Sequence, residues 1–510
     1  MSLLIFAALV LLCVLTIFRH VKSSNSPLPP GPRNLSLIGN TLHMPIGREW
    51  ITFAQWAKKY GDIMHLSVLG RSIIVLSSPK TISDLLDKRS TIYSDRPVLT
   101  MAGTLVGYDR VIPLEPYTPR HRQGRKLMQS AISPRTQPVL QASISSQMIH
   151  FLPRLVDSPA HFRQHTRWLV DSIVFQITYA YNISGHDDPL VQLADRVNRD
   201  FGRPIAPAAF LVDIFPSLRH IPDWFPGAGF KAIARDMRRT YLDMRDRQYD
   251  RIRAEVAHGT AKPSLVTTLI EGNPNPTPEE DDLYRNVVAS VYGAGSDTSV
   301  SALESFFLIM SRFPHVQKAA QAEIDAVVGR GRLPTFGDRE RLPYVDALIK
   351  EIYRWNPVVP MSLPHRLMQD DVYEGYHIPA GATVIGNSWA ILHDPDLYPD
   401  PFDVVPERYL MKQDGERNPD PRAFAFGYGR RVCPGQIIAD DTLFLFVASI
   451  LATFDVGPPL GANGRPHAQE DVAYTAELIS HPGPFDCTIT PRSADVEKLL
   501  ATLSVVADAA

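Results

Sequence analysis

The feature that most constrains this chain is one cysteine framed by glycines near the C-terminus. Residues 426–435 read Phe-Gly-Tyr-Gly-Arg-Arg-Val-Cys-Pro-Gly, and the mostly apolar stretch Ile437–Phe454 follows. Gly429 precedes Cys433 by four residues, and Gly435 follows it by two. Because glycine carries no Cβ, backbone N–H groups can approach the sulfur closely and stabilise its thiolate form. The segment is therefore a candidate thiolate site.

A single thiolate limits the kinds of metal centre that this segment can hold. A tetrahedral zinc or iron–sulfur site needs several protein ligands, whereas haem iron takes one axial ligand from the protein. The other cysteines, Cys13 and Cys487, lie far from Cys433 in sequence, so no disulfide framework is indicated. The alternative is a buried structural cysteine in a glycine-rich turn.

The spacing Phe-x-x-Gly-x-Arg-x-Cys-x-Gly is similar to the haem-binding signature of the cytochrome P450 family. The residues that match its fixed positions are Phe426, Gly429, Arg431, Cys433 and Gly435. The resemblance implies that Cys433 is the thiolate ligand of the iron in haem b. It implies that Phe426, Arg431 and Gly435 help to bind this cofactor. It also implies the cytochrome P450 fold, mainly α with small β-sheets, as a single large haem domain behind an N-terminal transmembrane helix.

The N-terminus carries an apolar segment that predicts this membrane anchor. Leu3–Phe18 is almost entirely apolar, and Arg19, His20 and Lys22 follow it directly. Because positive residues stay on the cytoplasmic side, residues 1–22 are expected to anchor the chain with its large domain in the cytosol. A cleaved signal peptide would need a basic start and an Ala-x-Ala-like site, and the sequence has neither.

A proline-rich stretch separates the anchor from the rest of the chain. Pro27–Pro32 contains four prolines, which favour a semi-rigid spacer, so residues 23–40 are interpreted as a hinge. Residues 41–510 are then one haem-thiolate catalytic domain. The 510 residues are 45% hydrophobic with a net charge of −2, which fits a large globular core and gives no indication of a nucleic-acid partner.

The longest helical pattern, Glu280–Phe313, contains Gly293 and Gly295. Glycines inside a helix indicate either tight packing or space for a small molecule. Asp297 and Thr298 come next, and the segment resembles the oxygen-binding element of the family, in which the helix bulges over the iron. The resemblance implies that Thr298 places a hydroxyl beside bound oxygen and that Asp297 relays protons from solvent. The alternative is that Thr298 bonds to its own helix and Asp297 is exposed.

Three further residues are candidates for binding the haem propionates. Tyr117–Lys126 opens a basic helix, whose alternative interpretation is a solvated basic face. Arg125 matches the arginine of the family's Trp-x-x-x-Arg pair, while His121 stands where tryptophan is usual. His365 falls where the family contacts a propionate. The remaining cations on the basic helix would suit docking of an acidic reductase.

Glu351 and Arg354 lie three residues apart on a predicted helix, where side chains meet. The resemblance implies that this pair is buried and joined by Arg408. We expect these three charges to hold the loop that presents Cys433.

Three other segments have a predicted local structure. Alternation over Ile63–Leu76 and over Tyr376–Val384 predicts two β-hairpins. Met101–Pro116 lacks helical periodicity and is expected to be a loop.

Taken together, the chain is identified as a member of the fungal microsomal cytochromes P450, similar to secondary-metabolism oxidoreductases such as the O-methylsterigmatocystin oxidoreductase group. The resemblance implies insertion of one oxygen atom of O2 into a lipophilic small molecule. Electrons would come from NADPH through NADPH–cytochrome P450 reductase at the endoplasmic reticulum membrane. The expected pocket lining is apolar and comprises Val291, Val358, Val359, Met361 and Leu363.

Two other functions remain open. A haem-thiolate isomerase or dehydratase needs no reductase, and its family members tend to lack the acid–hydroxyl pair that Asp297 and Thr298 supply here. A haem-binding sensor would have no turnover at all. A reconstituted assay with NADPH and reductase distinguishes the three.

Overall fold

The computed structural model describes residues 26–35, 38–185, 187–205, 209–410, 418–461, 463–469 and 471–508. Most of them are helical. The α-helices are α2 (Glu49–Tyr60), α3 (Pro79–Ile82), α4 (Ser90–Tyr93), α5 (Pro119–Ala131), α6 (Gln137–Asp157), α7 (Phe162–Tyr179), α8 (Pro189–Ile205), α9 (Leu211–Ile214), α10 (Gly229–Ala257), α11 (Leu265–Gly272), α12 (Pro278–Arg312), α13 (Pro314–Val327), α14 (Pro343–Trp355), α15 (Ser388–Leu392), α16 (Arg422–Ala425), α17 (Gln436–Thr453) and α18 (Ala494–Asp508).

Short turns of other helical types connect these elements. The 3-10 turns are η1 (Thr41–His43), η4 (Tyr108–Arg110), η5 (Pro159–His161), η6 (Pro216–His220), η7 (Phe336–Arg341), η8 (Pro406–Tyr409) and η9 (Gly429–Arg431). Two π turns are η2 (Ser83–Lys88) and η3 (Thr100–Val106).

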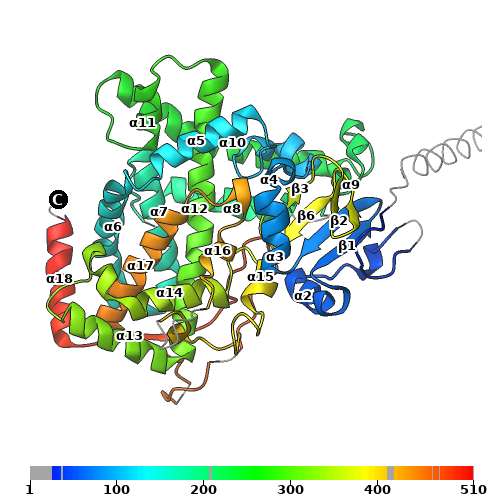
Figure 1. Cartoon of the computed structure of the whole chain (residues 1–510). Coiled ribbons are helices and arrows are strands. Elements are labelled where there is room, and N and C mark those ends of the chain that lie inside the picture. The colour runs from blue at the N-terminus through cyan, green and yellow to red at the C-terminus, as the bar shows by residue number, and fades with distance from the viewer. Residues whose placement is uncertain are drawn as a thin grey trace, which may run out of the picture.

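The described strands form small sheets. They are β1 (Ile63–Val68), β2 (Arg71–Leu76), β3 (His365–Arg366), β4 (Asp371–Tyr373), β5 (Tyr376–Ile378), β6 (Thr383–Gly386), β7 (Phe454–Gly457) and β8 (Thr488–Pro491). One sheet has the order β1-β2-β6-β3, in which β2 and β6 are parallel and the other pairs antiparallel. It lies beside α2, at the end of the molecule opposite α18 (Figure 1). A mainly helical fold with small sheets is therefore confirmed, while the predicted anchor lies outside the described residues.

Helix α12 runs through the middle of the helical part (Figure 1). Its start is fixed by a capping box: the Thr277 side chain accepts from the Glu280 N–H, and the Glu280 carboxylate accepts from the Thr277 N–H at 2.9 Å. Pro278 occupies the first turn, where no N–H is needed. Pro314 follows the helix and cannot continue it.

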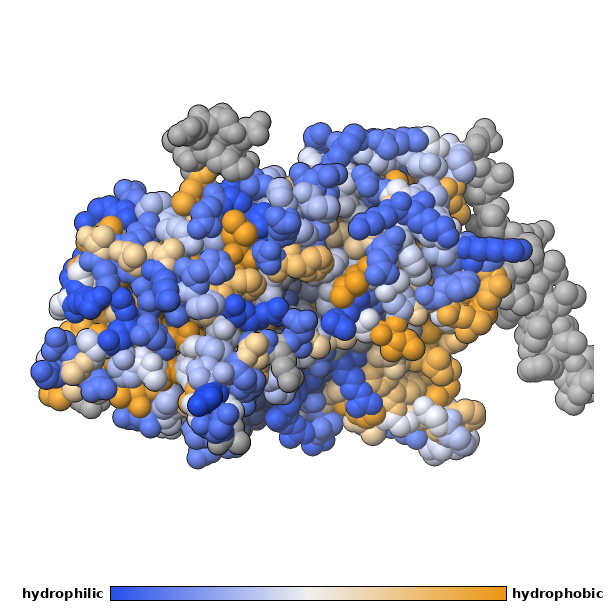
Figure 2. Space-filling model, turned by 90° about the horizontal axis from the view of Figure 1, so that it is seen from below, coloured by the Kyte–Doolittle hydropathy of each residue, from blue (hydrophilic) through white to orange (hydrophobic). Residues whose placement is uncertain are grey.

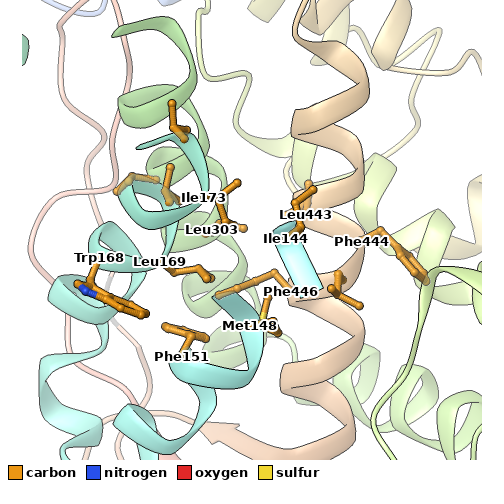
Figure 3. Close-up of a cluster of buried hydrophobic side chains, with 14 of the residues drawn as sticks. Ile144, Met148, Phe151, Trp168, Leu169, Ile173, Leu303, Leu443, Phe444 and Phe446 are labelled. Carbon is orange, nitrogen blue, oxygen red and sulfur yellow. The ribbon is translucent and has the colours of Figure 1, made fainter. Parts of the chain in front are cut away.

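The core forms where α6, α7, α12 and α17 meet (Figure 3). The labelled buried side chains are Ile144, Met148, Phe151, Trp168, Leu169, Ile173, Leu303, Leu443, Phe444 and Phe446. Burial of each large apolar side chain contributes about 1.5–3 kcal/mol. Because α17 begins directly after Gly435, this packing also fixes the position of the Cys433 loop.

Within the described residues, α17 is the one helix long and apolar enough to span a bilayer. Two thirds of it, 67%, is buried inside the protein, as expected for a helix that is apolar on every side.

Two local predictions were wrong. Residues 100–110 form the turns η3 and η4, and not a plain loop, because Met101, Ala102 and Val106 pack into a cluster with α10. The hairpin predicted for residues 376–384 does not form, since β5 pairs with β4 and β6 pairs with β2 and β3. Strand partners depend on tertiary packing, which the local sequence pattern does not encode. The hairpin over β1 and β2 is confirmed.

The described part of the proline-rich segment lies against the sheets. Pro30 O accepts from the His65 N–H at 2.9 Å, and Pro27 O accepts from the His377 N–H at 2.8 Å. A Cβ on Gly31 would lie 2.1 Å from His65 O, so only glycine permits this close approach.

Candidate active site

The Cys433 loop lies between α16 and α17 and is closed by backbone contacts. The Cys433 N–H donates to Phe426 O at 2.8 Å, and the Phe426 ring packs edge-on against Tyr353. Gly429 has φ +55°, and a Cβ there would lie 2.1 Å from Leu86 O. Gly429 is thus required because the backbone of η2 passes too close for a Cβ. The reason expected from sequence is another one, the approach of backbone N–H groups to the Cys433 sulfur.

The surroundings of the Cys433 sulfur both bury it and favour its anion. Burial raises the pKa of the thiol, while a hydrogen bond from the Gly435 N–H and the nearby Arg125 guanidinium act in the opposite direction. In the part of the chain that the structure describes, no group of three or more His, Cys, Asp or Glu side chains could hold a metal ion. The loop therefore offers one sulfur ligand.

A cluster of buried nitrogen donors lies around the Cys433 loop. Its members are Arg96, His121, Arg125, His365 and Arg431. We call this set the cation cluster. Arg96 donates to the backbone oxygens of Pro113, Leu363 and Pro364. Arg431 donates to those of Ser94, Ile112 and Glu115. Arg125 donates to Val432 O. The guanidinium partners given by these bonds are backbone carbonyls, and the two acids whose charges act on Arg96 and Arg431, Asp95 and Glu115, are fewer than the three guanidinium groups of the cluster.

The cation cluster is electrostatically strained. Burial, followed by Arg431 and Arg125, lowers the pKa of Arg96, and burial together with the arginines lowers the pKa of His121 to about 3. Both ring nitrogens of His121 are buried without a hydrogen-bond partner. The His365 ring is fixed by Nδ1, which donates to Tyr93 O at 2.7 Å.

The carboxylates nearest to the cation cluster already have partners. Asp95 accepts from the Arg366 side chain and from the Tyr117 N–H, and Glu115 accepts from Arg120 at 2.6 Å. Several buried guanidinium groups and an unpartnered imidazole therefore need an anion with more than one negative charge. Arg96 was missed from sequence, because no motif or spacing used there marks a lone arginine in an extended segment.

Thr298 and Asp297 are adjacent in sequence, but their side chains make different contacts. The Thr298 hydroxyl donates to Ala294 O at 2.6 Å, as the alternative interpretation expected. Ala294 is exposed although α12 runs through the core, so this turn faces an interior space. A Cβ on Gly295 would touch Val174 at 3.4 Å, whereas Gly293 has nothing within 4 Å. The helix is α-helical throughout, without the bulge implied by the resemblance.

Asp297 is held between two cations. Its Oδ1 accepts from Arg167 at 2.9 Å, and its Oδ2 lies 3.1 Å from His481 Nε2. Burial alone would raise the pKa of Asp297, but His481 and Arg167 lower it to about 2. Asp297 is therefore an ionised, paired group and not the exposed carboxylate of the alternative interpretation. Sequence reasoning assigned no role here to His481 or Arg167, which lie 184 and 130 residues away.

Glu351 lies at the centre of a fully buried charge cluster. It accepts from Arg354 Nε at 2.7 Å and Arg354 Nη2 at 2.8 Å, and from the Val405 N–H at 2.8 Å. Arg408 Nε lies 3.2 Å away, within ion-pair distance but poorly aligned for a hydrogen bond. These contacts join α14 to the segment around η8.

Comparison with known proteins places this architecture in a family. The family model described as Cytochrome P450 matches residues 29–483. The protein belongs to the cytochrome P450 family.

Similar curated proteins are fungal enzymes of this family. Cytochrome P450 monooxygenase 208 of Postia placenta is 42% identical over 498 residues, covering 98% of this chain and 96% of the relative. Cytochrome P450 monooxygenase COX2 of Coprinopsis cinerea is 41% identical over 486 residues, with coverage of 94% and 92%. Cytochrome P450 monooxygenase claR of Ampulloclitocybe clavipes is 39% identical over 483 residues, with coverage of 94% and 89%. The chain is thus an enzyme of the P450 monooxygenase type, for which haem with cysteine thiolate ligation is implied.

The residues present fit such a cofactor. The Cys433 loop supplies one sulfur with a hydrogen bond from Gly435, and the cation cluster suits a dianion such as a pair of propionates. The interior-facing turn at Ala294 and Thr298 leaves space on the α12 side.

Proposed function

We propose that the protein is a haem-thiolate monooxygenase that inserts one oxygen atom of O2 into a lipophilic small molecule. Cys433 would bind the iron of haem b, and Phe426, Arg431 and Gly435 would hold the loop and cofactor in place. His121, Arg125 and His365, together with Arg96, would bind its propionates. The observation that carries the proposal is the single hydrogen-bonded thiol beside the cation cluster, in which both ring nitrogens of His121 are buried without a hydrogen-bond partner.

The bound haem would supply activation of O2 for attack on a C–H bond, and the chain would supply protons and orientation. Thr298 would present its hydroxyl to the interior space, and its present bond to Ala294 O can be exchanged by rotation of the side chain. Asp297 would pass protons toward Thr298 once an ion pair opens.

Carbon monoxide difference spectroscopy tests the proposal. The reduced, carbon monoxide-treated protein should show the shifted Soret band that thiolate ligation produces, and Cys433→Ala should abolish it. Product formation that depends on NADPH and reductase supports a monooxygenase. Rearrangement without reductase would indicate an isomerase or dehydratase, and binding without turnover a sensor.

The redox partner that we propose is NADPH–cytochrome P450 reductase. A surface pocket of about 540 Å³ reaches Cys433, and its charged lining residues are Arg125, Arg339, Arg430, Asp440 and Asp441. Arg122 and Lys126 on α5 are exposed on the same basic segment. An acidic reductase surface would be attracted to this face, and reversing the charges of Arg122 and Lys126 should lower the rate of electron transfer most at low salt.

We propose attachment to the endoplasmic reticulum membrane through residues 1–22, with residues 23–40 as hinge and 41–510 as the cytosolic catalytic domain. Large apolar side chains are exposed at Ile46, Phe215 and Trp224. The Arg71 side chain donates to Asp213 O, which joins the segment before Phe215 to the sheet end of the molecule. Apolar side chains gather at the lower right of the face shown in Figure 2. Such a surface supports contact with a bilayer.

The substrate class that we propose is a lipophilic terpenoid, polyketide, steroid or aromatic compound, in secondary metabolism or xenobiotic oxidation. Val358, Val359, Met361 and Leu363 are partly accessible although buried residues flank them, which supports an apolar lining. Difference spectroscopy with a ligand panel tests this. Tight type-I shifts only with charged, water-soluble ligands would contradict it.

A further inference from the structure

His481 bridges two carboxylates of α12. Its Nε2 lies 3.1 Å from Asp297 Oδ2, and its Nδ1 lies 3.9 Å from Glu304 Oε2. Glu304 follows Asp297 by seven residues, two helical turns, so both carboxylates project from one face of the helix. One imidazole therefore connects the acid of the oxygen-binding segment to a second acid further along α12.

The segment that carries His481 is fixed to α12. Ser480 O accepts from the Ser301 hydroxyl at 2.6 Å and from Asn356 Nδ2 at 3.3 Å. The His481 N–H donates to the Thr475 hydroxyl at 3.0 Å. The ring is thus held in register with Asp297 by bonds that do not involve the ring itself.

The outer end of this bridge approaches the protein surface. Glu304 is paired with Arg163, whose Nη2 lies 2.8 Å from Oε2. Arg163 also lines a surface pocket of about 330 Å³, together with Gln164, Phe485 and Asp486. The outer end of the bridge therefore lies beside an arginine that borders this pocket, and the His481 side chain is itself 14% exposed.

We propose that His481 is the proton relay through which Asp297 is supplied from solvent. The charged groups that face it are Asp297 and Glu304 on α12, with Arg163 and Arg167 of α7 behind those carboxylates. Two cations contact Asp297. The Arg167 guanidinium does not release its proton, whereas the His481 imidazolium does.

The titration of these groups is consistent with the relay. Burial alone would lower the pKa of His481, but Asp297 and Glu304 raise it to about 9, so the imidazolium is the resting form at neutral pH. In one transfer, Nε2 gives its proton to Asp297 Oδ2. Nδ1 keeps its proton beside Glu304, and a solvent proton then restores the Nε2–H. One proton moves inward, and no electrons are exchanged.

The relay rests on the proposed function, and its first test needs no turnover. The holoenzyme in its diamagnetic reduced, carbon monoxide-bound form is labelled with 13C at histidine and titrated by NMR. The resonance that His481→Gln removes should titrate near pH 9, and Glu304→Gln should move its midpoint down toward the ordinary histidine value. A midpoint near 6.5 in the unsubstituted protein would overturn the proposal. His315→Gln, an exposed histidine on α13, is the matched control.

The second test measures proton delivery in the reconstituted enzyme. His481→Gln keeps an N–H donor for Asp297, but an amide does not release its protons. We expect about a 10–100-fold loss of product per NADPH consumed, with more peroxide, a larger solvent deuterium isotope effect and unchanged substrate affinity. Unchanged coupling and isotope effect would overturn the relay and leave His481 a structural ion-pair partner. The carbon monoxide spectrum of the same variant should stay that of a thiolate, so loss of that band would count against the proposed function instead.

Discussion

Replacing Glu351 by glutamine should destabilise the protein and weaken haem retention together. The carboxylate is fully buried, as is Arg354, and it faces the side chains of both Arg354 and Arg408. Glutamine has nearly the same shape and can still accept the Val405 N–H at 2.8 Å. The substitution therefore removes the negative charge and one of the two acceptor oxygens, and it turns an NH2 group toward the Nε donors of Arg354 and Arg408.

The magnitude follows from the burial of the partners. Breaking a buried ion pair costs about 3–5 kcal/mol, because the remaining cation stays buried without its counter-charge. Arg354 retains bonds to Pro401 O and Asp403 O, which places the expected cost toward the lower half of that range. With an unfolding entropy of about 2 cal/mol/K per residue, a loss of about 3.5 kcal/mol lowers the Tm of a domain of this size by roughly 3 °C.

Thermal unfolding at a fixed scan rate, together with the carbon monoxide band per mole of protein, measures both effects. The exposed Glu340→Gln on η7 is the matched control and should leave Tm and haem content unchanged. If Glu351→Gln had the Tm of the parent within 1 °C and full haem content, the clamp would not be stabilising the Cys433 loop, and the reasoning would be refuted.

Three further predictions follow from single residues. Arg96→Gln should lower the ratio of Soret to 280 nm absorbance after gel filtration, because a cluster with fewer cations binds the propionates less tightly. An unchanged ratio would exclude Arg96 from the propionate site. Thr298→Val should lower product per NADPH about 10–100-fold while Thr298→Ser retains it; equal coupling in both variants would contradict the hydroxyl role. Since the pKa of His481 is raised from 6.5 to about 9, its contribution to stability should be complete below pH 6.5 and lost as pH rises through 9, which calorimetry of the parent and His481→Gln can check.

Elements with strong local patterns were predicted well from sequence. The helix predicted over Glu280–Phe313 differs from α12 (Pro278–Arg312) by two residues at its start and one at its end, and β1 and β2 pair around a glycine turn as predicted. Predictions failed where the partner lies far away in the chain. Strand β6 pairs with β2 across more than 300 residues, and η3 becomes helical through packing against α10.

The residues of the candidate site also fall into those that a local sequence pattern predicts and those that it does not. Cys433 and its glycines form a contiguous segment, so their spacing could be matched to the haem-binding signature of the family, which implies a thiolate ligand. Arg96, Arg167 and His481 carry no local signal, because an isolated charged residue acquires a role only from the groups that surround it.

A short, continuous stretch of sequence encodes local chemistry: one sulfur with backbone donors, and an acid next to a hydroxyl on a helix. Which distant charges face one another depends on the packing of the helices. Folding brings α7, α12 and the C-terminal segment together at Asp297, and buries Arg96 close to Arg431. Electrostatic interactions depend on distance in space and on burial, and neither quantity can be read from distance along the chain.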